Sequence, residues 1–332
     1  MLPGYSFLEI QNLSIFLESR ISINHVDLII QEKSKVGIVG ATGSGKTTLL
    51  KAIAGLVQIE KGNIWFNQAK IKGPDEQLIP GNKMIGYLSQ YSELRNNYRV
   101  QELLEFHNHL SSEKIQKFCD ICAIGHLTER WTDELSGGEK QRIALALLLM
   151  SEPKVLLLDE PYSNLDNIHK EQMKLVIDQL SNKLNISCIM VSHDIPDLLL
   201  WADEIIVMKQ GRVIQKGDPE SIYNKPSTIY CAGIMGPYQL FDKSLAKNLL
   251  LPIPDFPSEK KLLIRPSFLG LEKNSTNESS YAISSIEFKG NYHLIGIKSN
   301  EGEFKCISTP YSGFAIGDKV NLKYLPNHFT FI

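Results

Sequence analysis

One segment of the sequence has the composition of a phosphate-binding loop. It reads Gly40-Ala41-Thr42-Gly43-Ser44-Gly45-Lys46-Thr47, is followed by Thr48, and matches the pattern G-x-x-x-x-G-K-[ST]. Its glycines leave room for backbone N–H groups to surround phosphate oxygens, which Cβ atoms would crowd. The lysine can contact the β- and γ-phosphates of a nucleotide, and the Thr47 hydroxyl can bind Mg²⁺.

Two adjacent carboxylates form the second chemical feature. Asp159 and Glu160 directly follow the apolar run Val155–Leu158, which is typical of a buried strand. From the end of such a strand Asp159 can reach a metal ion, through water, and Glu160 can polarise an attacking water molecule. Taken alone, the segment could equally be a strand followed by a solvated acidic turn. Its occurrence together with the phosphate loop favours the hydrolytic interpretation.

The third feature is the segment LSGGEKQR at residues 135–142. Ser136 and Glu139 have the spacing of a capping box at a helix start. Gly137 and Gly138 lie between them and would expose backbone N–H groups to an anion. Local physics alone favours an ordinary capped helix, and the order of the segments along the chain favours a ligand-binding one.

These segments together resemble the nucleotide-binding subunit of ATP-binding-cassette (ABC) transporters, over about residues 8–236. LSGGEKQR is similar to the signature of that family, which implies that the bound nucleotide is ATP. Gln90, in YLSQ, resembles the glutamine that senses Mg²⁺ and the membrane subunit, and His193, in IMVSHD, resembles the histidine at the γ-phosphate. Ser163-Asn164-Leu165-Asp166 resembles the loop that crosses the dimer interface, with Asn164 where alanine is common. Out of this context, Gln90 would be a surface glutamine and His193 a structural histidine capped by Asp194.

The resemblance also implies partners. Two copies would form a head-to-tail dimer, with each ATP between the phosphate loop of one chain and the Ser136-Gly137-Gly138 turn of the other. Integral membrane permease subunits would dock on a helical subdomain at about residues 91–150, beside Gln90. A periplasmic or lipid-anchored binding protein would take part indirectly. Adenine would stack on an aromatic side chain, for which the register leaves Phe16 and Leu17 as candidates.

The elements that must position these residues follow a repeating order of strand and helix. Strands are expected within residues 8–31, at Val36–Val39 and at Val155–Leu158, and helices at Thr47–Ala54 and Gly137–Met150. Such alternation predicts an α/β fold, a mainly parallel sheet with helices on its faces. A proline-rich linker at 237–261 and a small all-β, barrel-like domain at 262–332 should follow the nucleotide-binding domain at 1–236.

Composition excludes some classes of partner. The formal net charge is -2 and the pI is near 6.5, which is not typical of a nucleic-acid-binding protein. The longest apolar run, Ile143–Met150, is far shorter than the roughly 20 residues of a spanning helix, and no signal peptide is evident. Together with these absences, the resemblance implies a peripheral protein at the cytoplasmic face of the cell (inner) membrane.

The C-terminal part narrows the type of transporter. The segments Gln215–Pro219, Ile222–Pro226 and Ala232–Gly236 resemble the end of importer cassettes, and Leu263–Pro266 resembles the start of their regulatory β-domain. Importers of this kind serve sugars, polyamines, iron(III), sulfate and molybdate. Iron(III) or polyamine uptake is favoured, although no residue in the chain is expected to contact the cargo.

The sequence disfavours two other classes of protein. The motor of an exporter is disfavoured by the C-terminal β-domain, and a soluble cassette acting on ribosomes or DNA by the single cassette. Residues 262–332 carry seven Lys and Arg against six Asp and Glu, a balance of +1 that predicts no nucleic-acid surface. Cys119 and Cys122 have C-x-x-C spacing without a second pair nearby, which favours ordinary thiols over zinc ligands.

Overall fold

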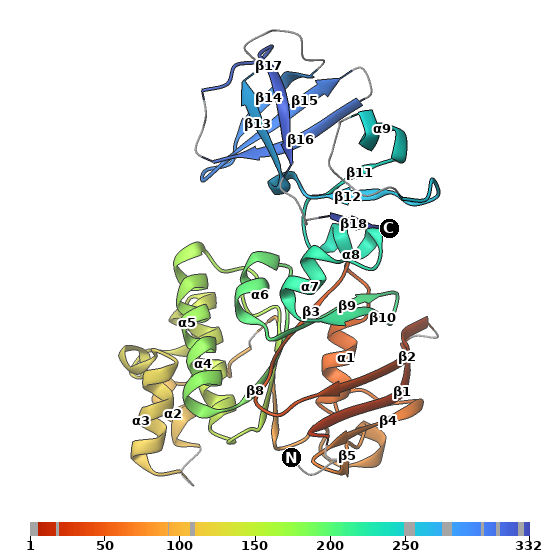
Figure 1. The fold of residues 1–332 in the computed structure, drawn as a ribbon. Helices are drawn as coiled ribbons and strands as arrows, with labels where there is room; N and C mark the ends of the chain where they lie inside the picture. Colours follow the sequence, from red (N-terminus) through yellow and green to blue (C-terminus); the bar gives the residue numbers. More distant parts are fainter. Residues whose placement is uncertain are drawn as a thin grey trace. The chain divides into compact units, whose positions relative to one another are not determined.

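A computed structural model describes residues 6–17, 20–91, 93–106, 110–248, 256–273, 281–299, 302–309, 313–324 and 329–332 (Figure 1). The chain divides into two compact units, Met1–Pro219 and Glu220–Ile332. Every segment that the sequence singles out for chemistry belongs to the first unit.

The central sheet of the first unit has six strands in the order β10-β9-β3-β8-β7-β6. Their bounds are β3 (Lys35–Val39), β6 (Ile85–Leu88), β7 (Val155–Asp159), β8 (Ser187–Val191), β9 (Glu204–Lys209) and β10 (Arg212–Gly217). All neighbours pair in parallel except β9 and β10, which form an antiparallel hairpin around Gln210-Gly211. Every residue of β7 and β8 is buried, as in parallel sheets covered on both faces. The predicted parallel α/β sheet is therefore confirmed.

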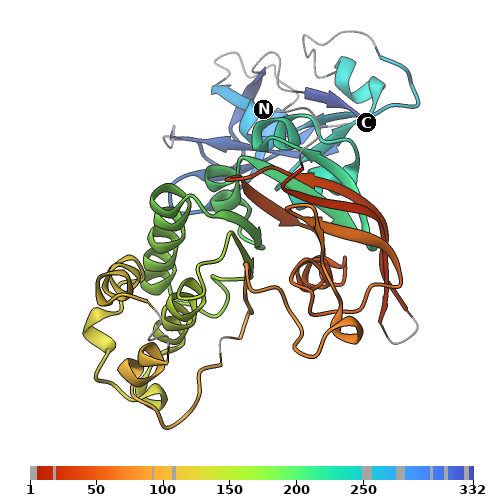
Figure 2. The same ribbon diagram turned by 90° about the horizontal axis from the view of Figure 1, so that it is seen from below.

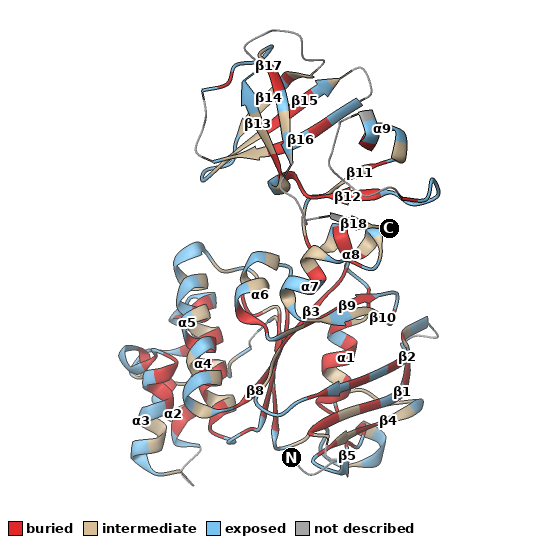
Figure 3. Cartoon of the chain, viewed as in Figure 1, coloured by how far each residue is buried: buried red, intermediate tan, exposed pale blue. Residues whose placement is uncertain are grey.

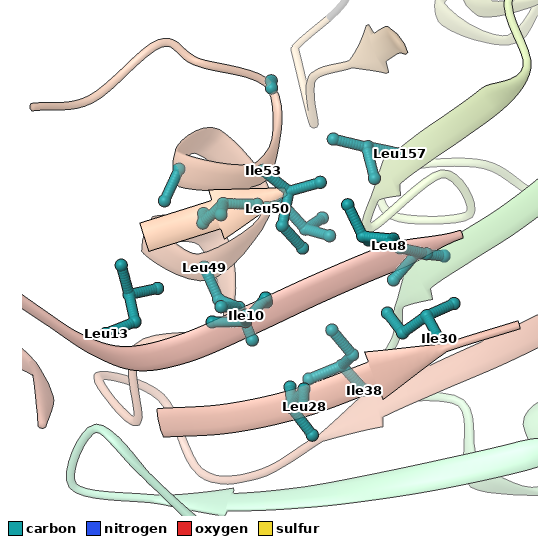
Figure 4. Packing of buried hydrophobic residues seen from close by; sticks show 14 of the residues in the cluster. Leu8, Ile10, Leu13, Leu28, Ile30, Ile38, Leu49, Leu50, Ile53 and Leu157 are labelled. Atoms are coloured by element: carbon teal, nitrogen blue, oxygen red, sulfur yellow. The ribbon is translucent and has the colours of Figure 1, made fainter. Parts of the chain in front are cut away.

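A second, antiparallel sheet has the strand order β2-β1-β4-β5. It contains β1 (Leu8–Leu17), β2 (Arg20–Ile30), β4 (Lys61–Phe66) and β5 (Ala69–Lys70). Helix α1 (Lys46–Ile53) packs its apolar side chains among those of both sheets, with Leu49, Leu50 and Ile53 close to Leu8 and Ile38 (Figure 4). This core fixes the start of α1, and with it the phosphate loop.

Helices α2 to α5 gather on one side of the first unit in both views (Figures 1 and 2). They are α2 (Val100–Glu105), α3 (Ser112–Ile121), α4 (Gly137–Leu149) and α5 (Asn167–Leu184), and α6 (Ile195–Trp201) follows β8. The residues that α4 and α5 bury are mainly apolar (Figure 3). Among the residues described, no helix is both long and apolar enough to cross a bilayer.

The second unit contains two antiparallel sheets, β11-β12-β18 and β13-β17-β14-β15-β16, as expected for a small β-domain. Its elements are α7 (Pro219–Asn224), α8 (Ile229–Ile234), β11 (Gln239–Phe241), α9 (Lys243–Asn248), β12 (Leu262–Ile264), β13 (Leu269–Lys273), β14 (Tyr281–Phe288), β15 (His293–Ser299), β16 (Gly302–Ser308), β17 (Lys319–Tyr324) and β18 (Phe329–Phe331). The stretch 237–261, expected as a linker, thus includes β11, which pairs with β12, and α9. Residues 249–255 of that stretch lie outside the described residues.

A buried arginine explains why residues 220–236 group with the β-domain. Arg265 is only 2% exposed and donates hydrogen bonds to the backbone oxygens of Tyr223, Ala232, Gly236 and Pro237. Its guanidinium group also lies 3.9 Å from the centre of the Tyr223 ring. Two of these carbonyls lie in α7 and α8, and the other two follow α8. The side chain of Arg265 therefore connects both helices to β12, the strand that directly precedes Arg265.

Candidate functional site

The phosphate loop connects β3 to α1, as predicted. Gly45 has φ +99°, and a Cβ atom there would lie 2.6 Å from the Ser22 carbonyl oxygen, so only glycine fits. The ammonium group of Lys46 donates hydrogen bonds to the carbonyl oxygens of Gly40 (2.8 Å) and Ala41 (3.1 Å). The loop therefore surrounds the side chain of Lys46. The loop ends at the start of α1, where backbone N–H groups lack partners within the helix.

A cavity of about 370 Å³ opens at this loop. It is lined by Ser22, Thr42, Gly43, Ser44, Gly45, Lys46, Thr47, Thr48, Gln90, Glu160 and His193. Lys46 is 6% exposed, and burial lowers its pKa while Glu160 and Asp159 oppose that effect. The buried hydroxyl of Ser44 has no hydrogen-bond partner among the described residues, although Ser44 lines the cavity. A buried hydroxyl of this kind is satisfied when an acceptor such as a phosphate oxygen enters the cavity.

The cavity lies at the carboxyl ends of adjacent parallel strands. The loop follows β3, Glu160 follows β7, His193 lies two residues beyond β8, and Gln90 lies two residues beyond β6. Ligands of open α/β sheets bind at this edge because loops from neighbouring strands converge there. The sheet therefore brings together four predicted site segments that are far apart in the sequence.

Asp159 is held by two hydroxyl groups. Thr47 Oγ1 donates to one carboxylate oxygen at 3.1 Å, and the Tyr87 hydroxyl donates to the other at 2.9 Å. Burial and the charge of Asp159 raise the pKa of Tyr87 well above its usual range, so this hydroxyl stays protonated and remains a donor. The carboxylate is 3% exposed, and its orientation is set by α1 on one side and β6 on the other.

Glu160 is paired with His193. The Nε2 atom of His193 lies 2.7 Å from Glu160 Oε1, and the two side chains come from the ends of neighbouring strands. Burial raises the pKa of Glu160 above its ordinary value, against the opposing charges of His193 and Lys46. A raised carboxylate pKa suits a general base, since proton transfer is most efficient when the pKa lies near the working pH. The Asp194 carboxylate, which the structural alternative assigns to His193, lies 2.7 Å from the ammonium group of Lys170.

The oxygen donors around Asp159 suit magnesium. A hydroxyl, a carboxylate and an amide are present in Thr47, Asp159 and Gln90, and two of them line the cavity. No group of three or more histidine, cysteine, aspartate or glutamate side chains able to hold a metal occurs among the described residues. Mg²⁺ does not need one, because it commonly takes one or two protein ligands and completes its shell with phosphate and water.

The signature segment forms the capped helix start that its sequence predicts. The Ser136 hydroxyl accepts a hydrogen bond from Glu139 N (3.3 Å), and the Glu139 carboxylate accepts one from Ser136 N (2.8 Å). Ser136, Gly137, Gly138 and Asp166 do not line the phosphate-loop cavity. Gly137 instead lines a neighbouring cavity of about 200 Å³, which Gln90 and Asn164 also line.

The exposed fractions of Phe16 and Leu17 are too similar to show which of the two side chains contacts adenine. They are 39% and 43% exposed at the end of β1, opposite Ile21 and Arg20 of β2. Neither lines the phosphate-loop cavity. The choice between them as the adenine contact stays a prediction.

Comparison with known proteins shows the family. Residues 23–163 match the family described as ABC transporter. The sulfate/thiosulfate import ATP-binding protein of Mesostigma viride is 36% identical over 301 residues, which cover 86% of this chain and 85% of the relative. An Fe(3+) ions import ATP-binding protein of Haemophilus influenzae is 31% identical and covers 88% of both chains. The spermidine/putrescine import ATP-binding protein of Borreliella afzelii is 28% identical and covers 96% of both.

Solved structures agree with this result. The chain superposes on cbiO1 from Clostridium perfringens, part of the ABC transporter complex cbiONQ, with a TM-score of 0.58 and 26% identity. The match covers 65% of this chain and 90% of cbiO1. The chain belongs to the ABC transporter family. Within that family it is an ATP-binding subunit of the importer type, an ATPase that powers transport.

Tyr87 and His169 are contact residues that the sequence did not reveal. Tyr87 binds Asp159, and His169 accompanies Asp166, with its Nδ1 atom 2.9 Å from Asp166 Oδ1. The contact of Tyr87 depends on tertiary packing, because it joins β6 to β7. The contact of His169 depends on where α5 begins, because Asp166 is the N-cap of that helix. The only signals available were the position of Tyr87 in YLSQ and the three-residue spacing of Asp166 and His169.

Tyr87→Phe is predicted to weaken cation binding. The variant keeps the ring but loses a hydrogen bond to a charged carboxylate, a contribution of about 1.5–3 kcal/mol. In the presence of ATP, Mn²⁺ affinity measured by electron paramagnetic resonance should fall about tenfold, while metal-free nucleotide affinity stays the same. Tyr98→Phe, which removes a hydroxyl away from the cavity, is the control. Equal Mn²⁺ affinity in both variants would show that Tyr87 does not orient Asp159.

Proposed function

We propose that this chain binds MgATP in the phosphate-loop cavity and hydrolyses it with Glu160 as the residue that activates water. The observation that carries this proposal is the convergence of Lys46, Glu160, His193 and Gln90 on one cavity at the carboxyl edge of the sheet. The backbone of residues 40–48 would bind the phosphate chain, with Thr48 held in place by the Ser22 hydroxyl at 2.7 Å. Phe16 would stack on adenine.

Each side chain in the cavity has a distinct proposed task. Lys46 would contact the β- and γ-phosphates as a fixed positive charge, and His193 would contact the γ-phosphate while it orients Glu160. Thr47, Asp159 and Gln90 would hold Mg²⁺, directly or through water. When bound, Mg²⁺ would neutralise charge on the phosphate oxygens. Glu160 would take the proton of the attacking water, which its raised pKa favours.

We further propose that two copies form a head-to-tail dimer around two ATP molecules. Ser136, Gly137, Gly138 and Asp166 would complete the site of the partner, which agrees with their position outside the cavity of their own chain. ATP would stabilise the closed dimer because both faces contact it, and hydrolysis would release that link. Closing and opening would move the permease subunits, which we propose dock on the helical part of residues 91–150. The chain would therefore act at the cytoplasmic face of the membrane.

Residues 1–236 would serve as the nucleotide-binding domain and residues 262–332 as a regulatory domain. The cargo that we propose is iron(III) or a polyamine, delivered by a periplasmic or lipid-anchored binding protein. Relatives named for Fe(3+) and for spermidine and putrescine support these two, while a relative named for sulfate makes an anion the competing class.

Uptake measurements distinguish these cargo classes. In cells that lack this chain, uptake of labelled putrescine or of labelled iron(III) should fall several-fold, and the intact chain should restore it. The Lys46→Ala chain should not restore uptake, because it lacks the phosphate contact that powers transport. Normal uptake of both cargoes together with lost sulfate uptake would contradict the assignment.

Glu160→Gln is predicted to bind ATP normally and to hydrolyse it at least about 100-fold more slowly. The amide keeps the size of the side chain but cannot accept the proton of water. Steady-state ATPase assays and size-exclusion chromatography with ATP should show lost turnover and an accumulated dimer. Turnover near that of the wild type would reject Glu160 as the base.

Mixing two inactive chains tests the shared site. Lys46→Ala chains and Ser136→Arg chains should each be nearly inactive alone, since one lacks the phosphate contact and the other blocks the approach of the signature turn. A mixed dimer has one composite site with both lesions and one with neither, so part of the ATPase activity should return. Two Lys46→Ala preparations mixed together serve as the control. Normal hydrolysis by monomeric Ser136→Arg would show that one chain contains a complete site.

A further inference from the structure

Two helices that begin at the proposed partner-facing segments lie side by side. Helix α4 begins after Ser136 and α5 begins after Asp166, and each of these residues caps its helix. Arg142 Nη1 of α4 donates a hydrogen bond to Gln172 Oε1 of α5 at 2.9 Å. One helical turn nearer the two N-termini, Gly138 of α4 faces His169 of α5.

Gly138 has a steric reason to be glycine. A Cβ atom at this position would lie 3.0 Å from each of the Cβ, Cγ and Cδ2 atoms of His169. The residue lies within α4 and does not have a positive φ, so its backbone conformation would accept any L-residue. Gly137 differs, because a Cβ atom there would meet none of the described atoms within 4 Å. A side chain at residue 138 would therefore require His169 to shift by a few tenths of an ångström, and this crowding favours glycine there within a single chain.

The same histidine is bound to Asp166. The Asp166 carboxylate accepts a hydrogen bond from the backbone N of His169 at 2.9 Å, and the imidazole Nδ1 lies 2.9 and 2.8 Å from its two oxygens. These contacts lower the pKa of Asp166 below its ordinary value. His169 thus touches the signature helix with its ring and holds the cap of α5 with its nitrogen atoms.

We propose that His169 is a positioning residue that fixes the signature turn and Asp166 relative to each other before they meet the ATP of the partner. This inference rests on the proposed dimer. In the proposed dimer, Ser136 and Asp166 must reach one partner site at the same time, and separate motion of α4 and α5 would misplace one of them. The imidazole prevents this by filling the space that Gly138 leaves open.

A double-mutant cycle tests the contact in the full chain without nucleotide. Helix propensity alone predicts that Gly138→Ala stabilises α4. The contact with His169 predicts the opposite, a melting temperature lower by about 2–4 °C. In a His169→Gly background, which removes all three contacting atoms, the same substitution should cost little or raise the melting temperature. Gly137→Ala is the matched control and should not lower it.

The positioning role is tested by a pair of His169 variants in a Glu160→Gln background. Asparagine can present a side-chain N–H to Asp166 much as the imidazole Nδ1 does, whereas leucine fills similar space without a donor. His169→Asn should dimerise with ATP nearly as the parent does, and His169→Leu about tenfold less tightly. Monomer affinity for ATP should be unchanged in both, because the phosphate loop is intact.

Three outcomes would overturn this inference. One is an equal cost of Gly138→Ala with and without His169, which would show that the contact with His169 is not what disfavours a side chain at residue 138. Another is equal dimerisation of the asparagine and leucine variants. A third is loss of ATP affinity in monomeric His169→Leu, which would indicate a general structural defect. If the parent chain itself does not dimerise with ATP, the proposed dimer fails, while the nucleotide-free cycle still reports on the contact.

Discussion

The carboxyl ends of β3, β8, β7 and β6 meet at one edge of the sheet, and the whole site depends on that alignment. Parallel pairing places the loop after each strand beside the loop after its neighbour. A strand register shifted by one residue would turn Asp159 or its neighbours to the opposite face of the sheet. Complete burial of β7 and β8 on both faces opposes such a shift, because it would move a charged residue at a strand end, Lys154 or Asp159, into the apolar layers.

At this edge of the sheet, the charged states of Lys46, Asp159 and Glu160 depend on one another. Lys46 is buried with two carboxylates nearby, and each carboxylate is held by a second group, His193 for Glu160 and two hydroxyls for Asp159. A buried ammonium group without such neighbours would tend to lose its proton, and a buried carboxylate would tend to gain one. These neighbours therefore favour the charged forms of Lys46 and Glu160, which the proposed roles of both residues require.

Much of the site could be predicted from the sequence because its signals are local. The phosphate loop, the capping box at Ser136 and the strand before Asp159 are contiguous patterns, and the structure contains each of them. The approach of Tyr87 to Asp159 is different in kind, since it follows from which strand lies beside β7. Hydrophobic periodicity reports that a strand is buried but not which neighbour covers it.

The same limit explains the differences in the C-terminal part. Prolines between residues 237 and 257 suggested a linker, yet β11 forms there because β12 provides a pairing edge, and α9 follows it. Likewise the sequence predicts that the nucleotide-binding domain ends at residue 236, whereas the contacts divide the chain between Pro219 and Glu220. Arg265, whose five hydrogen bonds reach back to residues 223–237, shows how one long-range side chain decides the grouping.

The two glycines of the signature turn show why residue type alone does not identify a ligand contact. Both were interpreted as room for an approaching anion, since glycine at a helix start is otherwise unfavourable. That interpretation remains possible for Gly137, where a Cβ atom would have no neighbour within 4 Å in the described part of the chain. For Gly138 the chain itself supplies a reason, the ring of His169. The two glycines thus differ in what they leave space for. Gly138 leaves space for a side chain of its own chain, and Gly137 leaves space for the proposed partner. Only the packing around each residue distinguishes the two cases.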